Sequence, residues 1–210
     1  MIILLRITLE EIYLNELTNS NNWDELSLKY KLSDDILIEF VDKLNWELIS
    51  VYQQLSENQI SRFIDKINWH SISKCQKLTE KFIEKFANYI DWDWISIKQK
   101  LSERFIEKHL DKLNLHYIVQ CQKLSENFLR KHQDILDWDR ISIYQKLSES
   151  FIEEFQNKVN WNTICIDQNL SESFIEKYSD KINWDLIIKY QKLSSDFKEK
   201  YKNKVNGYLL

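Results

Sequence analysis

The sequence predicts an all-α protein, an α-solenoid of eight tandem 23-residue two-helix repeats with short terminal caps. Three observations favour this fold: one motif recurs every 23 residues, its apolar residues follow helical spacing, and the chain has one glycine and no proline. Sheet-rich folds usually need Gly, Pro, Asn-Gly or Asp-Gly turns, which this chain almost lacks. Short helices joined by tight turns are therefore expected.

The period is set by tryptophans and by a Leu-Ser or Leu-Thr pair. Tryptophan recurs every 23 residues, with Leu115 in the fifth place, in the series Trp23, Trp46, Trp69, Trp92, Leu115, Trp138, Trp161 and Trp184. Eight repeats fill residues 23–206 without an insertion, with the consensus W-D-x-I-S-x-Y-Q-K-L-S-E-x-F-I-E-K-F-x-D-K-I-N. Positions are numbered from the tryptophan. Such strict self-similarity is typical of a solenoid.

Each repeat is predicted to contain two helices of about ten residues, too short to be stable alone. Asn or Asp at position 23 is expected to cap the first helix, and Ser at position 11 the second. The first helix should bury positions 1, 4, 5 and 8, and the second positions 14, 15, 18 and 22. Stacking of neighbouring repeats then supplies the core.

Two recurring side chains have both a structural and a functional interpretation. The tryptophan at position 1 could bind a ligand, but its place in the apolar pattern favours the core. Glutamine fills position 8 in seven of the eight repeats. It could form a functional ladder, but we expect it to satisfy backbone groups in the turn between the two helices.

The remaining segments and the overall composition suggest a cytoplasmic protein. Residues 1–22 match a degraded half-repeat that would cap the first stack, and residues 207–210 form an apolar tail. The net charge is −4, and no apolar stretch is long enough to span a membrane. The start lacks a basic region, so we expect no signal peptide, and three widely spaced cysteines fit reduced thiols.

A candidate binding stripe lies at positions 3, 6 and 7, where the side chain varies from repeat to repeat. Positions 3 and 7 are neighbours on the first helix, facing away from its apolar stripe. Their high apolar and aromatic content indicates either partial burial between repeats or a binding surface, and we favour the second interpretation. The candidate partner-binding residues are Tyr52, Trp94, Lys98, Tyr117, Arg140 and Tyr144.

The 23-residue unit of residues 23–206 resembles the short helical repeats of uncharacterised proteins from large DNA viruses and from phages of AT-rich hosts. In general form it is also similar to tetratricopeptide and HEAT arrays, although their repeats are longer and none of their motif residues occur here. The resemblance implies a solenoid fold and macromolecular partners. It implies no functional residue.

Catalytic, metal and cofactor sites are not expected. The chain has no Gly-rich phosphate loop, no nucleophile signature and no acid–base pair that stands out from the repeat. The fifth repeat departs most, and His109, His116, Cys121 and His132 raise the question of a metal. Their spacing matches no established zinc pattern, so we interpret them as locally altered packing.

These observations predict a non-enzymatic solenoid that binds a protein partner along the stripe, centred on the fourth to sixth repeats. In a virus or phage it would act in the host cytoplasm as an antagonist of a host protein. Two alternatives stay open. The chain could self-assemble end to end through its apolar termini, or its lysine columns could hold nucleic acid or nucleotides as a sponge.

Overall fold

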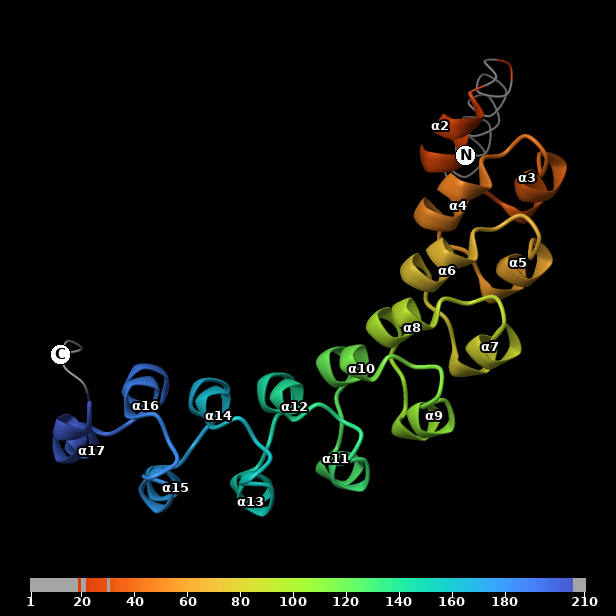
Figure 1. The fold of residues 1–210 in the computed structure, drawn as a ribbon. Helices are drawn as coiled ribbons and strands as arrows, with labels where there is room; N and C mark the ends of the chain where they lie inside the picture. The colour runs from red at the N-terminus through yellow and green to blue at the C-terminus, as the bar shows by residue number, and fades with distance from the viewer. Residues whose placement is uncertain (1–18, 20–21, 30, 206–210) are drawn as a thin grey trace, which may run out of the picture. The chain divides into compact units, whose positions relative to one another are not determined.

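The protein forms two rows of short helices in a computed structural model that describes residues 19, 22–29 and 31–205 (Figure 1). These residues contain no strand. The first helices of the repeats are α2 (Trp23–Lys29), α4 (Trp46–Tyr52), α6 (Trp69–Cys75), α8 (Trp92–Lys98), α10 (Leu115–Cys121), α12 (Trp138–Tyr144), α14 (Trp161–Asp167) and α16 (Trp184–Tyr190). The predicted all-helical fold with a tryptophan repeat is confirmed.

The second helices form the other row and end with one 3-10 turn. They are α3 (Asp34–Glu39), α5 (Glu57–Arg62), α7 (Glu80–Lys85), α9 (Glu103–Lys108), α11 (Glu126–Lys131), α13 (Glu149–Glu154), α15 (Glu172–Lys177) and α17 (Ser195–Tyr201), followed by η1 (Lys202–Lys204). Most have 6 residues, and the first helices have 7, so both are shorter than the ten residues expected from the sequence. The predicted cap at residues 1–22 and the tail at 207–210 fall almost wholly outside the described residues.

The chain divides into two compact parts, an N-terminal half of residues 1–101 and a C-terminal half of residues 102–210. Within the N-terminal half, α2 packs on α4, α4 on α6 and α6 on α8. Within the C-terminal half, α10 packs on α12, α12 on α14 and α14 on α16. Within each half, the first helices therefore stack on their counterparts in the next repeat, which is the packing of a solenoid.

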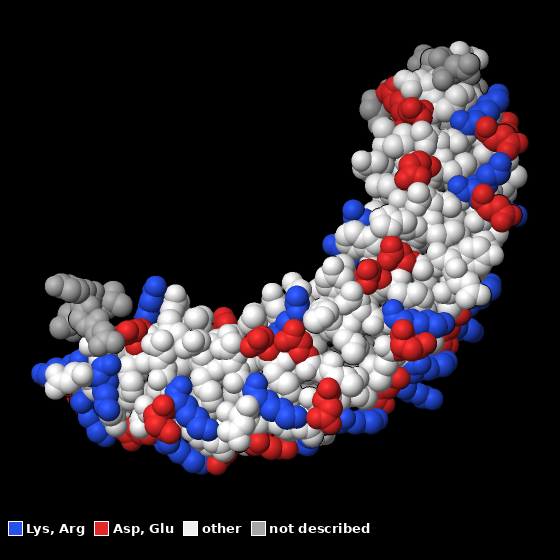
Figure 2. All heavy atoms as spheres, in the orientation of Figure 1, with Lys and Arg blue, Asp and Glu red and all other residues white. Residues whose placement is uncertain are grey.

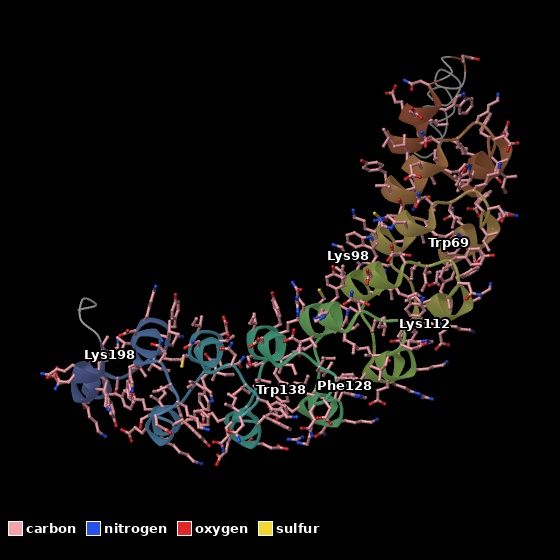
Figure 3. All side chains as sticks on the ribbon, viewed as in Figure 1. Trp69, Lys98, Lys112, Phe128, Trp138 and Lys198 are labelled. Atoms are coloured by element: carbon pink, nitrogen blue, oxygen red, sulfur yellow. The ribbon has the colours of Figure 1, made fainter. Side chains whose placement is uncertain are left out.

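Most of the expected core positions are buried, although position 1 is partly exposed in six of the eight repeats. Position 4 is fully buried in every repeat, as is position 15 in the first seven. The phenylalanines at position 14 and the aliphatic residues at position 22 are buried as well, for example Phe151 and Val159. Trp138 and Phe128 point between the two rows of helices (Figure 3). The apolar spacing in the sequence therefore located the core correctly.

Both helix starts are capped as predicted. The Asn68 side chain accepts a hydrogen bond from the backbone N–H of Ser71, and Ser56 caps α5 in the same way. The N–H of Ser56 itself is bound by Gln59 of the same helix, but five later caps gain a partner from the preceding repeat, because the glutamate at position 12 accepts from the cap's own N–H, as Glu126 does from Ser148 at 2.6 Å. The caps thus link one repeat to the next.

The tryptophans bind the turn that follows the second helix. In six repeats the indole N–H at position 1 donates to the backbone carbonyl at position 19 of the preceding repeat, for example from Trp46 Nε1 to Val41 at 2.7 Å and from Trp161 Nε1 to Gln156 at 2.9 Å. That carbonyl is therefore satisfied without further helix. Trp46 and Trp184 are buried, whereas Trp69 and Trp161 remain partly exposed.

The glutamine at position 8 has a structural role, as predicted, but it joins repeats and not the two helices of one repeat. Gln76 accepts from the N–H of Leu55 at 3.1 Å and donates to the carbonyls of Ser50 and Gln53 at 3.1 and 2.7 Å. All three backbone groups belong to the preceding repeat. Gln168 makes the same bonds in the C-terminal half, to Leu147, Ser142 and Gln145.

Serine at position 5 completes the polar framework. Ser50 is fully buried, donates to the carbonyl of Trp46 at 2.7 Å and accepts from the N–H of Asn68 at 2.9 Å. The hydroxyl thereby connects the start of its own helix to the start of the next first helix. A buried hydroxyl with both roles filled costs little to bury. The same arrangement recurs at Ser142, which contacts Trp138 and Asn160.

Candidate functional site

Positions 6 and 7 of the first helices carry most of the exposed large apolar side chains. Nine such side chains are exposed among the described residues, and six of them occupy these two positions: Leu28, Tyr52, Ile143, Tyr144, Ile166 and Tyr190. The fold itself needs none of these six, because positions 1, 4, 5 and 8 face the core. The clustering therefore marks the outer face of the first helices as the candidate site.

The six predicted binding residues differ in how they are presented. Tyr52 and Tyr144 are 62% and 45% exposed. Lys98 is also exposed and points outward from α8 (Figure 3). Trp94, Tyr117 and Arg140 are only partly exposed. Tyr52, Trp94 and Lys98 belong to the N-terminal half and the other three to the C-terminal half, so the structure groups them into two sets of three.

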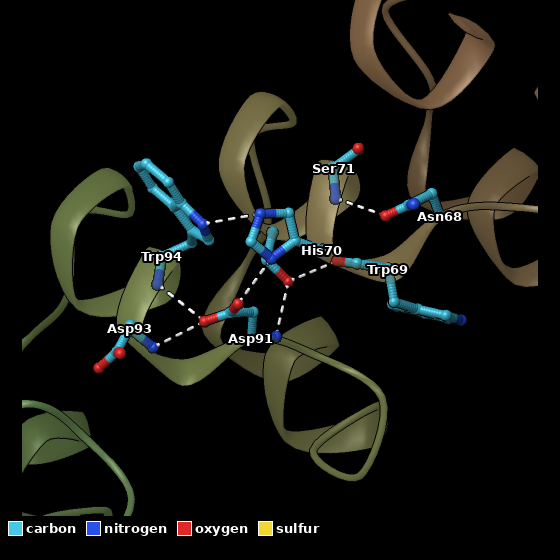
Figure 4. Close-up of polar contacts among 8 residues, drawn as sticks. Asn68, Trp69, His70, Ser71, Asp91, Asp93 and Trp94 are labelled. Carbon is cyan, nitrogen blue, oxygen red and sulfur yellow. Dashed lines mark hydrogen bonds and ion pairs between the residues drawn. The ribbon is translucent and has the colours of Figure 1, made fainter. Parts of the chain in front are cut away.

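Trp94 is held by a hydrogen-bonded chain of three side chains (Figure 4). Its indole N–H donates to His70 Nε2 at 3.2 Å, and His70 Nδ1 lies 2.8 Å from Asp91 Oδ2. An indole N–H can only donate, so Nε2 must be the unprotonated nitrogen and Nδ1 must carry the proton that Asp91 accepts. Lys74 Nζ lies 4.6 Å from the centre of the Trp94 ring. These contacts fix the ring on the face.

The pairing of His70 with Asp91 replaces a different pair used elsewhere. In the second and sixth repeats an acid at position 2 accepts from the amide of the Asn cap at position 23, as Glu47 does from Asn68 at 2.7 Å. Asp139 and Asn160 pair in the same way at 2.8 Å. Where position 2 is histidine, the cap is aspartate. The donor and the acceptor have exchanged positions, so His70 binds the Asp91 cap as Glu47 binds the Asn68 cap.

The fifth repeat follows the same rule and has no further sign of a special site. His116 Nδ1 lies 3.6 Å from the Asp137 cap. The rings of His109 and His132 lie 4.5 Å from those of Phe105 and Phe128, as the phenylalanines or tyrosines of other repeats do. Within the described residues no group of three His, Cys, Asp or Glu side chains could hold a metal ion. Altered packing accounts for these histidines.

Arg140 is also held by its neighbours. Its Nη1 donates to Gln120 Oε1 at 3.2 Å, and its Nε lies 3.6 Å from Asp137 Oδ2. Gln120 comes from α10, so the guanidinium spans two successive first helices. Because this salt bridge is partly exposed, it adds little stability.

One group of exposed apolar side chains on consecutive helices was only partly chosen from the sequence. It comprises Ile143, Tyr144, Ile166 and Tyr190 on the consecutive helices α12, α14 and α16, and we call it the α12–α16 patch. Of its members only Tyr144 is among the predicted binding residues. The positions were correctly identified as variable, but a sequence does not say which variable side chains are covered by a neighbouring repeat.

The second helices present the opposite kind of surface. Charged side chains at positions 16 and 17 pair between successive repeats, as in Glu176 with Lys200 at 2.7 Å and Arg130 with Glu154 at 2.7 Å. In each pair the hydrogen bond from the basic group lowers the pKa of the carboxyl. In the C-terminal half, red and blue side chains alternate over the row of second helices (Figure 2). Many of the charges on this face are therefore paired within the chain.

Neither a membrane-spanning helix nor a similar known protein helps to locate the functional site. No helix in the described part of the chain is long and apolar enough to cross a membrane. No protein-family model, no curated protein and no solved structure matches the chain. The function must therefore be argued from the exposed face of the first helices.

Proposed function

We propose that the protein is a non-enzymatic repeat protein that binds a protein partner through the outer face of its first helices. The single observation that carries the proposal is the concentration of exposed apolar and aromatic side chains at positions 6 and 7. Apolar groups gathered on one face lose free energy when a partner covers them. Aromatic and arginine side chains give the largest binding increments at interfaces, and Tyr144, Tyr190 and Arg140 share this face.

The proposal includes a biological setting taken from the resemblance of the repeat. In a large DNA virus or phage, the protein would act in the host cytoplasm and antagonise a host protein by occupying one of its surfaces. The face varies from repeat to repeat while the core and the caps stay constant. Such an arrangement lets the binding residues change without cost to the fold.

Of the two rival functions, end-to-end self-assembly is less favoured at the C-terminal side. Position 15 is fully buried in the first seven repeats, but in α17 it is the exposed Lys198 (Figure 3). A charged residue there opposes the stacking of another helix row on this end. The sponge function is opposed by acids at position 2, including Asp139 and Asp185, on the same row of helices.

The test compares face variants of each half with a control on the other row. Partners are captured from the native host with the full chain, and each is then titrated by calorimetry against Tyr144→Ala/Tyr190→Ala and Tyr52→Ala/Lys98→Ala. We expect at least one double variant to lower affinity about tenfold or more, which corresponds to about 1.4 kcal/mol. Ile135→Ala, which removes an exposed apolar side chain on the second-helix side, is the matched control and should bind normally. Equal binding by all variants would contradict the proposal.

A further inference from the structure

One polar contact in the N-terminal half depends on the protonation state of a histidine. The His70 ring lies between two groups of the following repeat, with Nδ1 2.8 Å from Asp91 Oδ2 and Nε2 accepting from the Trp94 indole N–H at 3.2 Å (Figure 4). The His70 and Trp94 rings meet edge to face, with an interplanar angle of 86°. The His70 side chain is 60% exposed, so protons reach it directly from solvent.

The Asp91 side of this contact is fixed by three further hydrogen bonds. Asp91 Oδ1 caps α8 by accepting from the backbone N–H groups of Asp93 and Trp94 at 3.0 and 3.2 Å. The N–H of Asp91 donates to Ser73 Oγ at 2.9 Å. Turning the carboxylate away would remove the cap of α8, so Asp91 holds His70 Nδ1 in place. The orientation of the ring therefore leaves Nε2 facing Trp94.

Protonation changes the role of only one of the two ring nitrogens. Nδ1 donates to Asp91 in the neutral ring and in the imidazolium alike. Nε2 accepts a hydrogen bond in the neutral ring, but in the imidazolium it carries a proton and can only donate. The indole N–H of Trp94 is also a donor, so protonation sets two donors against each other. Histidine is the side chain that ordinarily gains its proton between about pH 8 and about pH 5.

The surrounding charges favour movement of Trp94 over movement of His70. Helices α4 and α8 pack against α6. Besides His70, the charged side chains of these three helices and of their caps are Glu47, Lys74, Asp91, Asp93 and Lys98. A charged imidazolium binds the Asp91 carboxylate more strongly than a neutral ring does. Lys74 Nζ already lies 4.6 Å from the centre of the Trp94 ring, so protonated His70 adds a second cation beside the indole.

The C-terminal half contains the same histidine–aspartate pair without the tryptophan. His116 Nδ1 lies 3.6 Å from Asp137 Oδ2, and position 3 of the following repeat is Arg140. The Arg140 guanidinium approaches the same Asp137 oxygen and donates to Gln120. Neither contact uses the His116 ring as an acceptor, so protonation of His116 opposes no described donor. Coupling to a third side chain thus depends on Trp94 and not on the pair itself.

Neither a metal site nor the needs of the cap account for this arrangement. Within the part of the chain that the structure describes, no three His, Cys, Asp or Glu side chains could hold a metal ion. The equivalent Asn68 cap is bound by Glu47 alone among side chains. The bond from Trp94 to His70 is therefore additional to what the helix start requires.

We propose that His70 controls the position of Trp94: the neutral ring holds the indole on the face of α8, and the protonated ring releases it. The N-terminal half therefore presents a fixed Trp94 at neutral pH and a mobile one in mild acid. A side chain that is already fixed loses less conformational entropy on binding, so a partner that covers Trp94 binds more tightly at neutral pH. This consequence for a partner rests on the proposed function, whereas the coupling of His70 to Trp94 does not.

Nuclear magnetic resonance of the full, isotope-labelled chain tests the coupling without a partner. The Trp94 indole N–H signal is assigned by its loss in Trp94→Phe, and the His70 ring signals by their loss in His70→Gln. Between about pH 8 and about pH 5 the Trp94 signal should shift with the same midpoint as the His70 ring. A soluble gadolinium chelate should broaden it more at the acidic end. A signal that stays constant, follows the titration of carboxyl groups, or shifts without becoming more accessible would overturn the inference.

Glutamine provides a matched pair of variants, because its amide both accepts and donates hydrogen bonds but takes up no proton in this range. In His70→Gln, the position and accessibility of the Trp94 signal should no longer depend on pH. In His116→Gln, the same change at the equivalent position of the C-terminal half, both should titrate as in the wild type. Circular dichroism should show equal helicity in all three proteins. A Trp94 signal that titrates in His70→Gln as in the wild type would also overturn the inference.

The protein partner captured from the native host tests the consequence for binding. Calorimetry at about pH 7.5 and about pH 5.5 should show binding to the wild type about three- to tenfold weaker in acid, and the same affinity at both pH values for His70→Gln. A partner that binds Trp94→Ala normally, or that loses affinity for it yet binds the wild type equally at both pH values, contradicts the role of His70 in binding. If Tyr52→Ala/Lys98→Ala and Tyr144→Ala/Tyr190→Ala both bind normally, the proposed function is wrong, and the Trp94 signal alone decides the coupling.

Discussion

Replacing one position-8 glutamine should weaken the contact between two neighbouring repeats. Gln76 is 7% exposed, and its amide binds three backbone groups of the preceding repeat. In Gln76→Ala, the N–H of Leu55 and the carbonyls of Ser50 and Gln53 lose this partner. A net contribution of about 1 kcal/mol for each hydrogen bond gives a loss of about 3 kcal/mol.

Urea denaturation followed by circular dichroism measures this loss as a lower unfolding midpoint. The stability of a solenoid is approximately the sum of the stabilities of its repeats and of the interfaces between neighbouring repeats. A weakened interface should therefore also broaden the unfolding transition. Gln54→Ala is the matched control, because Gln54 is exposed and should change stability by less than about 0.5 kcal/mol. A loss of stability below about 1 kcal/mol for Gln76→Ala, or an equal loss for Gln54→Ala, would refute the conclusion that the position-8 glutamine holds neighbouring repeats together.

Three further predictions concern the indole, the thiols and the ion pairs. Trp161→Phe keeps one aromatic ring but removes the five-membered ring and the N–H that donates to the Gln156 carbonyl, so calorimetric unfolding should show a loss of at least about 1 kcal/mol; an unchanged Tm would contradict this. Cys75 and Cys121 are exposed and should react with Ellman's reagent in the native protein, whereas burial raises the pKa of Cys165, so that the third thiol should appear only after denaturation. The Lys200 hydrogen bond lowers the pKa of Glu176, so the pair stabilises the fold above the ordinary value of 4.5 and its contribution is lost as the pH falls through the lower folded-state pKa. Carboxyl titration by NMR should show the pKa of Glu176 return toward 4.5 in Lys200→Gln.

Most of the fold could be predicted because each structural need recurs in every repeat. Caps such as Ser56 and Asn68 recur in all eight repeats and buried residues such as Ile60 in seven, always at one spacing, which separates them from chance. The length of the helices was overestimated, and nothing in the composition indicates that the indole of Trp69 binds the carbonyl of Ile64 in the turn after the second helix.

The candidate site was harder to predict because its residues do not recur. Positions 3, 6 and 7 were recognised as variable, but the exposure of Ile166 and Tyr190 depends on how neighbouring side chains pack. The contact of Trp94 with His70 was also missed. One signal was present: His70 and Asp91 depart from the consensus together, and such paired departures indicate contact between two positions.

The inverted ion pair between the fifth and sixth repeats restricts how such a chain can change in length. Arg130 faces Glu154, whereas Glu153 faces Lys177 and Glu176 faces Lys200. Loss of the seventh repeat, residues 161–183, would bring Glu153 opposite Lys200 and restore a favourable pair. Loss of the sixth, residues 138–160, would bring Arg130 opposite Lys177 and place two positive charges together. Duplication and deletion of repeats are therefore tolerated at some junctions and penalised at others, so the order of the repeats carries information that their shared consensus does not.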